Sequence, residues 1–110
     1  MNQKTLTALR GSIKKWERIG AGTGRDKGAA NCPLCKRFGE ECYIDEENEL
    51  CPVAFRSGAK GCQRTPYTTW KLTVGGRFYA DYEKGVKAKT LEQRRAARVE
   101  LKFLKSLLPK

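Results

Sequence analysis

The sequence predicts a small, mainly α-helical domain that is pinned by one zinc site of the four-cysteine type and has little or no β-structure. Three observations predict this fold class. Apolar residues recur at helical spacing near both ends of the chain. All five cysteines lie between Cys32 and Cys62. At 110 residues the chain is one domain, small enough that a bound metal would matter to its stability.

The single domain, residues 1–110, divides into three segments. Residues 1–28 are predicted to form an N-terminal helix and a glycine-rich loop. Residues 29–64 form the cysteine-containing, metal-binding segment, and residues 65–110 form the C-terminal helices.

The first helix is expected over residues 5–19, because four apolar side chains fall on one stripe: Leu6, Leu9, Ile13 and Trp16. The glycine-rich stretch 20–28 follows. It lacks the preceding strand and the Gly-Lys-Ser/Thr ending of a phosphate-binding loop. We interpret it as a flexible linker to the cysteines, with Arg25 and Lys27 free to meet a phosphate or an acidic group.

The cysteines have the spacing of a tetrahedral metal site. Cys32-Pro33-Leu34-Cys35 is a C-x2-C pair in which Pro33 fixes a tight turn, so that two sulfurs converge on one ion. Thiolates are soft ligands, and structural zinc takes four ligands. Cys51 precedes a proline and Cys62 follows a glycine, which are natural bends. We predict Zn²⁺ bound by Cys32, Cys35, Cys51 and Cys62, with Cys42 as the substitute ligand.

Two other uses of the thiols stay open. Disulfides need an oxidising compartment, and residues 1–15 show neither the apolar core nor the cleavage site of a secretory signal. The odd number of cysteines also argues against full pairing. Free or redox-active thiols are the second alternative, although a thioredoxin-like use of Cys32 and Cys35 would require a preceding strand.

Short elements are predicted after the first cysteine pair. Residues 36–38 continue as a helical turn or a strand, and Pro52 begins one or two helical turns that end before Ser57-Gly58. A helix starts at Thr65-Pro66 and ends at Gly75-Gly76. The aromatic residues in and after it are expected mainly in the core, with stacking on unpaired bases as the alternative: Tyr67, Trp70, Phe78, Tyr79 and Tyr82.

The last helix begins at Thr90 with a capping box and runs to about Leu108. Five cations cluster within about 100° on its wheel and form what we call the basic ridge: Arg94, Arg95, Arg98, Lys102 and Lys105. Most other positions are apolar, so we expect burial on most sides. Glu100 falls in the apolar arc, where we expect a salt bridge to a cation from an earlier segment, or else an exposed, snorkelling side chain.

The net charge of +11 is the second main feature of the chain. Such a charge attracts polyanions, of which nucleic acid is the commonest, and an acidic protein would use the same field. We expect the basic ridge, together with Lys36 and Arg37, to meet the partner. Lys36 and Arg37 could equally balance the negative charge of a thiolate-bound zinc.

Histidine is absent, which removes the usual proton carrier and the common nucleophile pairs, so we expect no enzyme. No apolar run approaches 18 residues, so we expect no membrane span.

Several motifs resemble those of small cysteine-rich proteins encoded by bacteriophages and prophages. They are Cys32-Pro-Leu-Cys35, Cys51-Pro-Val, Gly61-Cys62, Thr65-Pro-Tyr67 with Trp70, and the ending Glu100-Leu-x-Phe-Leu-x-x-Leu-Leu-Pro109. That group has a further cysteine where this chain has Asn48, which leaves open whether Cys42 supplies a ligand. The resemblance implies a bacterial cytoplasm and a viral or mobile-element role.

The predicted function is therefore a zinc-binding, phage-type accessory or regulatory protein that binds nucleic acid non-catalytically. The alternative is a phage protein that binds and inhibits or redirects a host protein, such as a defence system or a polymerase component.

Overall fold

The computed structural model describes residues 2–39, 51–58, 62, 65–75 and 84–109. Within these ranges the protein is mainly helical, which confirms the helical part of the predicted fold class. The described residues include no β-strand, only an isolated antiparallel bridge between Asp26 and Val86. No helix in the described part is long and apolar enough to cross a membrane. Seven residues named in the sequence analysis lie outside the described ranges: Cys42, Asn48, Gly61, Gly76, Phe78, Tyr79 and Tyr82.

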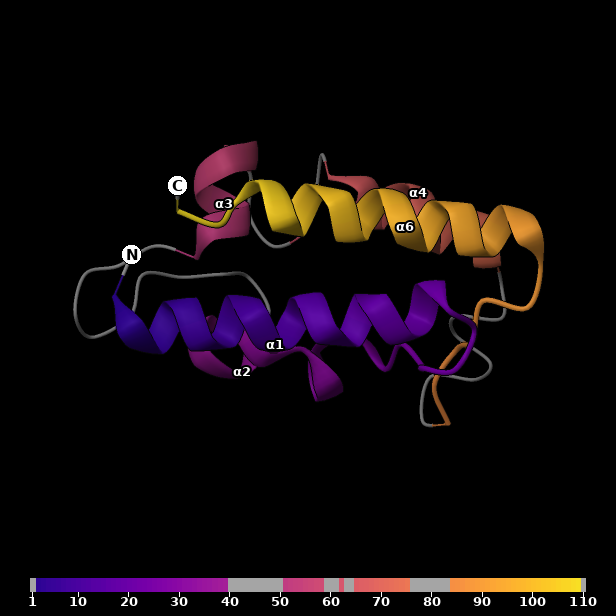
Figure 1. The fold of residues 1–110 in the computed structure, drawn as a ribbon, viewed down its shortest axis with the longest axis horizontal. Coiled ribbons are helices and arrows are strands. Elements are labelled where there is room, and N and C mark those ends of the chain that lie inside the picture. Colours follow the sequence, from indigo (N-terminus) through magenta and orange to yellow (C-terminus); the bar gives the residue numbers. More distant parts are fainter. Residues whose placement is uncertain (1, 40–50, 59–61, 63–64, 76–83, 110) are drawn as a thin grey trace.

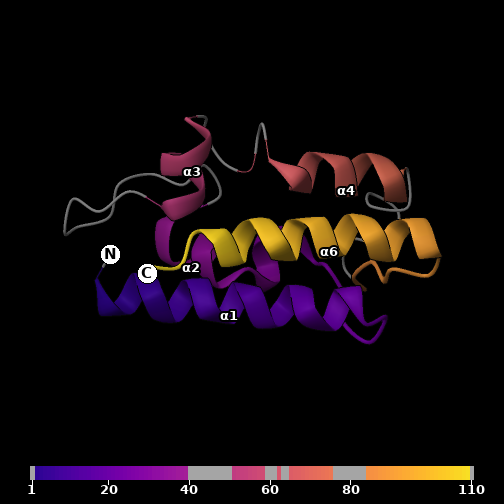
Figure 2. The ribbon, with the colours of Figure 1, turned by 45° about the horizontal axis from the view of Figure 1, so that its top comes forward.

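The architecture is a stack of helices around one core (Figure 1). Its elements are α1 (Gln3–Gly20), the 3-10 helix η1 (Gly28–Asn31), α2 (Pro33–Phe38), α3 (Pro52–Ser57), α4 (Pro66–Val74) and α6 (Leu91–Ser106). Helices α1 and α6 run antiparallel, side by side, and α6 also packs against α4 (Figure 2). Helix α2 packs against α1. Helix α6, near the C-terminus, therefore packs against α1, near the N-terminus, and against α4.

The long helices begin where side-chain caps satisfy their first backbone amides. Helix α1 begins at Gln3, two residues before the prediction, because Asn2 Oδ1 accepts the Thr5 amide at 2.9 Å. The capping box of α6 is confirmed: Thr90 Oγ1 accepts the Gln93 amide at 3.1 Å, and Gln93 Oε1 accepts the Thr90 amide at 3.2 Å. Helix α6 ends at Ser106 rather than near Leu108.

The shorter helices follow the predicted start and stop signals. Thr65 Oγ1 accepts the Tyr67 amide at 3.3 Å at the start of α4, and the helix ends before Gly75. Helix α3 ends at Ser57 and is capped by Gly58, whose φ of 69° is the left-handed conformation that favours glycine. Residues 36–38 belong to the helix α2, so they form a helical turn and not a strand.

Aromatic rings from two helices meet in the core. Trp16 of α1 lies edge to face against Trp70 and Tyr67 of α4, with ring centroids 5.4 and 5.8 Å apart. Trp16 and Trp70 are buried, which confirms them as core residues. The expectation that α6 is buried on most sides is wrong. Val99 and Leu91 are 54% and 60% exposed, because the helices that pack on α6 in the described structure, α1 and α4, leave its outer side open.

Candidate functional site

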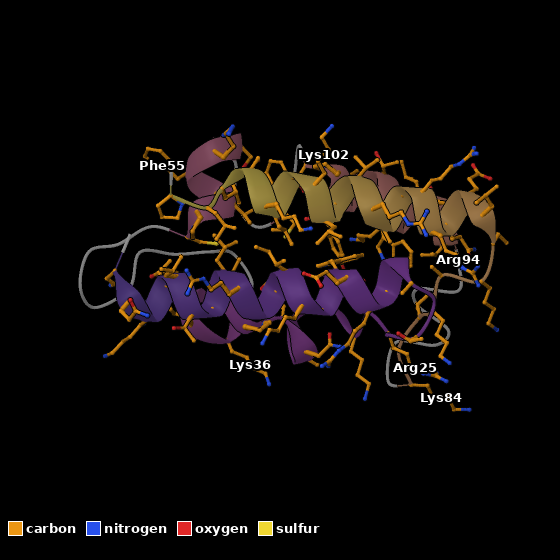
Figure 3. The ribbon with its side chains drawn as sticks, viewed as in Figure 1. Arg25, Lys36, Phe55, Lys84, Arg94 and Lys102 are labelled. Carbon is orange, nitrogen blue, oxygen red and sulfur yellow. The ribbon has the colours of Figure 1, made fainter. Side chains whose placement is uncertain are left out.

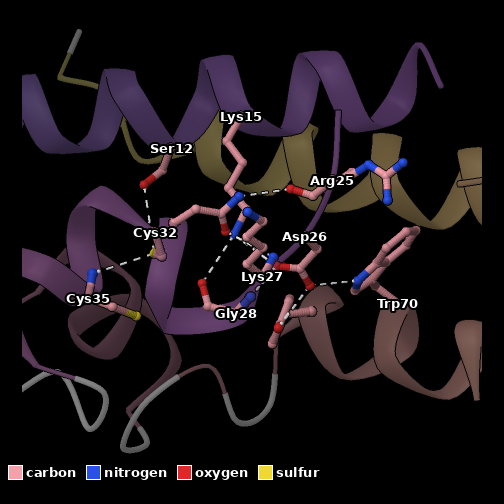
Figure 4. Close-up of polar contacts among 11 residues, drawn as sticks. Ser12, Lys15, Arg25, Asp26, Lys27, Gly28, Cys32, Cys35 and Trp70 are labelled. Atoms are coloured by element: carbon pink, nitrogen blue, oxygen red, sulfur yellow. Dashed lines mark hydrogen bonds and ion pairs between the residues drawn. The ribbon is translucent and has the colours of Figure 1, made fainter. Parts of the chain in front are cut away.

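The first cysteine pair forms a compact turn at the start of α2, which we call the knuckle (Cys32 to Cys35). Cys32 is the N-cap of α2, and its Sγ accepts the Cys35 amide at 3.4 Å (Figure 4). Ser12 of α1 places its Oγ 4.0 Å from the same sulfur. Pro33 at the first helical position closes the turn, as the sequence predicts.

The knuckle favours the ionised form of its first thiol. A side-chain hydrogen bond with Cys35 lowers the pKa of Cys32 to about 6, assisted by the positive charge of Lys15 and opposed by burial. Because the thiolate is the form that binds metal ions, Cys32 is prepared as a ligand near neutral pH.

The other two described cysteines, Cys51 and Cys62, differ in burial. Cys51 is buried at the start of α3, and Cys62 packs against the core. Burial, together with the negative charges of Cys32, Glu100 and Cys51, raises the pKa of the Cys62 thiol to about 12. These groups therefore lie close enough to interact electrostatically. A cation bound beside Cys62 would lower the pKa of its thiol and favour the thiolate.

The donor chemistry of the cysteines fits zinc, and the knuckle supplies two of the predicted ligands. The four described cysteines form no disulfide with one another. Among the described residues, no group of three or more cysteine or carboxylate side chains is gathered tightly enough to hold a metal ion. The structure thus brings Cys32 and Cys35 together and leaves Cys51 and Cys62 nearby.

Asp26 organises the interior beside the knuckle, and sequence reasoning missed it. Its side chain is 0% exposed and accepts bonds from three elements of the fold, α1, η1 and α4 (Figure 4). Oδ1 pairs with Lys15 Nζ at 2.9 Å and accepts the Gly28 amide at 2.8 Å, while Oδ2 accepts Trp70 Nε1 at 2.9 Å and the Tyr67 hydroxyl at 3.0 Å. Burial and the charge of Asp26 raise the pKa of Tyr67, so its hydroxyl stays a donor.

These bonds correct the interpretation of residues 20–28 as a flexible linker. The backbone of Asp26 pairs with Val86 in both directions at 2.9 Å, and its side chain ties the loop to α1 and α4. The available signal was the Asp-x-Gly sequence, in which an aspartate accepts the amide two residues later. Arg25 also donates to the Lys84 carbonyl oxygen at 3.3 Å.

Glu100 is the second buried carboxylate, only 3% exposed. Its predicted burial is confirmed, but the predicted salt bridge is not formed with any described residue, and Oε2 has no hydrogen-bond partner there. Burial raises the pKa of Glu100 to about 8, with a further contribution from the negative charge of Cys32. Lys15 is near enough to oppose this shift, yet its ammonium group pairs with Asp26 instead.

The basic ridge lies along the open side of α6, and all five of its side chains are exposed. Arg94 donates from Nε to the Ala88 carbonyl oxygen at 3.3 Å, and its guanidinium lies over Gly22. No ridge residue forms an ion pair with a described carboxylate. Figure 3 shows Arg94 and Lys102 at separate places along the helix, so the positive charge is spread along it.

The two cations after the knuckle face different ways. Lys36 is exposed and extends from α2 away from α1 (Figure 3). Arg37 turns toward α1, where its guanidinium donates to Thr5 Oγ1 at 3.0 Å and to Asn2 Oδ1 at 3.4 Å. Arg37 therefore also fastens α2 to the start of α1.

Comparisons with protein-family models, with curated proteins and with solved structures found no match for this chain.

Proposed function

We propose that the protein is a small zinc-binding module that binds nucleic acid without catalysis, through the basic ridge of α6. One observation carries the proposal: five exposed cations follow one side of a helix that the core holds in place. Because no described carboxylate pairs with them, their charge is free to act on phosphates. Contacts of this kind position a protein on nucleic acid without reading its sequence.

Zinc would be held by Cys32 and Cys35, with Cys51 and Cys62 as the second pair and Cys42 as the substitute. The amide-to-sulfur bond of the knuckle and the lowered pKa of Cys32 support this assignment. When bound, zinc would supply a cross-link between α2 and the segment that carries α3, and a positive charge beside the thiolates.

A second candidate function is the binding of an acidic host protein, and one exposed aromatic residue favours it. Phe55 of α3 is 78% exposed and lies away from the core (Figure 3). Aromatic side chains of this kind are common anchors in protein interfaces. The resemblance to phage-encoded proteins supports a setting in the cytoplasm of a bacterial host for either function.

Fluorescence anisotropy with labelled duplex and single-stranded DNA and RNA tests the proposal. We expect the unmodified protein to bind near physiological salt. The triple variant Arg94→Gln, Arg98→Gln, Lys102→Gln should bind at least about tenfold more weakly to every sequence, since each lost phosphate contact weakens binding alike. The matched control removes three exposed charges elsewhere: Lys4→Gln, Arg10→Gln, Arg56→Gln.

Equal weakening in the ridge variant and the control would show that overall charge, not the ridge, drives binding. If the unmodified protein binds none of the four nucleic acids, the proposal fails. A host partner would instead lose affinity mainly through a single change, Phe55→Ser, with little dependence on salt.

A further inference from the structure

A groove of about 370 Å³ lies between α1 and residues 24–33. Four cations line it, and no acidic residue is among the described residues that do so. The polar lining residues are Lys14, Lys15, Arg18, Arg25 and Asn31. None of the basic-ridge residues takes part, so the groove is a separate positively charged site.

Most of the positive charge in the groove is uncompensated. The ion pair with Asp26 cancels the charge of Lys15. Lys14 and Arg18 are exposed and form no ion pair with a described residue. Arg25 donates to a backbone carbonyl oxygen, which leaves its charge in place. Three cations with uncompensated charge therefore line one concave surface, an arrangement that favours an anion.

The walls of the groove are fixed before any ligand arrives. Asn31 donates from Nδ2 to the Arg25 carbonyl oxygen at 2.9 Å and accepts the Lys27 amide at 3.0 Å, which closes the loop on itself. Gly24 lets the loop lie directly on α1, because a Cβ there would stand 2.7 Å from Arg18 Cβ. A ligand would not have to order the backbone, which lowers the cost of binding.

We propose that this groove binds a phosphate group, with Lys14, Arg18 and Arg25 as its donors. Arginine and lysine together suit this chemistry, because guanidinium groups grip two phosphate oxygens and an ammonium group adds a point charge. A free nucleotide and a nucleic-acid strand both present phosphate. The inference goes beyond the proposed function, since it holds for either source and uses none of the ridge residues.

Amide-proton NMR of ¹⁵N-labelled protein tests the site with three probes: inorganic pyrophosphate, AMP and a (dT)₁₂ oligonucleotide. We expect saturable shifts of the Gly11 and Gly24 amide signals, because both residues line the groove. The variant Lys14→Gln, Arg18→Gln should weaken binding of the responding probe at least about tenfold. Lys4→Gln, Arg10→Gln removes the same charge from the same helix outside the groove and should leave it unchanged.

The three probes separate the two sources of phosphate. A response to pyrophosphate or AMP assigns the groove to free phosphorylated ligands, and a response to the oligonucleotide alone assigns it to a strand. No saturable shift with any probe, or equal weakening in both double variants, overturns the proposal. The proposed function is tested separately, by comparing binding of the oligonucleotide to the ridge variant and to the unmodified protein.

Discussion

Asp26 and Glu100 are both buried carboxylates, and their surroundings are opposite. Asp26 receives an ammonium group, a backbone amide, an indole and a phenol. Glu100 Oε2 receives no bond from any described residue. The difference arises because Lys15, which lies near both, pairs with Asp26 at 2.9 Å. One cation cannot neutralise two acids, so Glu100 is left without this partner, and burial raises its pKa.

Two thiols, Cys32 and Cys62, interact electrostatically with Glu100, and loss of the predicted zinc-binding thiols should give the largest effect. Cys32→Ser or Cys35→Ser should abolish zinc binding and largely unfold the protein, because metal binding is coupled to folding. Cys42→Ser should keep both metal and fold. Native mass spectrometry for one zinc per chain and circular dichroism measure this.

Stoichiometric disulfides without metal would contradict the zinc assignment. Loss of metal in Cys42→Ser with retention in Cys51→Ser or Cys62→Ser would move Cys42 into the ligand set.

Breaking the Asp26 ion pair should give the next largest effect. Asp26→Asn leaves Lys15 charged and largely buried without its partner, which costs about 3–5 kcal/mol in the free energy of unfolding. Urea denaturation measures the change, and Glu17→Gln, an exposed acid on α1, is the control at about 0.5 kcal/mol or less. A loss below about 1 kcal/mol for Asp26→Asn would show that the loop does not depend on this pair.

Removing the carboxylate of Glu100 should raise stability, whereas removing that of Asp26 should lower it. The pKa of Glu100 is raised from 4.5 to about 8 in the folded protein, so the protonated form stabilises the fold. That contribution is complete below about pH 4.5 and is lost as pH rises to 8.

Glu100→Gln should therefore remove this loss and raise stability near pH 8 by about 1–3 kcal/mol. The measurement is the unfolding midpoint of both proteins from about pH 5 to about pH 8. A pH dependence unchanged by the substitution would show that Glu100 is ionised in the fold.

Removing one neutral donor from Asp26 should have the smallest effect. Tyr67→Phe deletes the hydroxyl bond of 3.0 Å and keeps the ring against Trp16. We expect a loss of about 1–2 kcal/mol by urea denaturation, because the acceptor is charged. A loss as large as that of Asp26→Asn would mean that the phenol, rather than the ammonium group, holds the loop.

Local signals in the sequence predicted the helices well. Thr90 and Gln93 define the start of α6, and Gly58 defines the end of α3, because caps depend on residues a few positions apart. The apolar positions around Glu100 likewise predicted its burial.

The partners of the buried charges could not be predicted in the same way. Lys15 and Asp26 belong to different elements, and their meeting depends on how the loop folds back on α1. The sequence spacing predicted one site of four cysteines, whereas no three of the described cysteines are gathered tightly enough to hold a metal ion. The groove beside α1 depends on the same loop, so the sequence could indicate that Arg25 was free to meet a phosphate but not that Lys14 and Arg18 line the same groove.

The salt dependence of nucleic-acid affinity tests the central claim most directly. The logarithm of affinity should fall linearly with the logarithm of salt concentration, by about 0.9 for each phosphate contacted on duplex DNA. We predict that Arg94→Gln, Arg98→Gln, Lys102→Gln flattens this slope by roughly 2 to 3 relative to the unmodified protein. An identical slope in both proteins would contradict the assignment of the α6 ridge as the nucleic-acid interface.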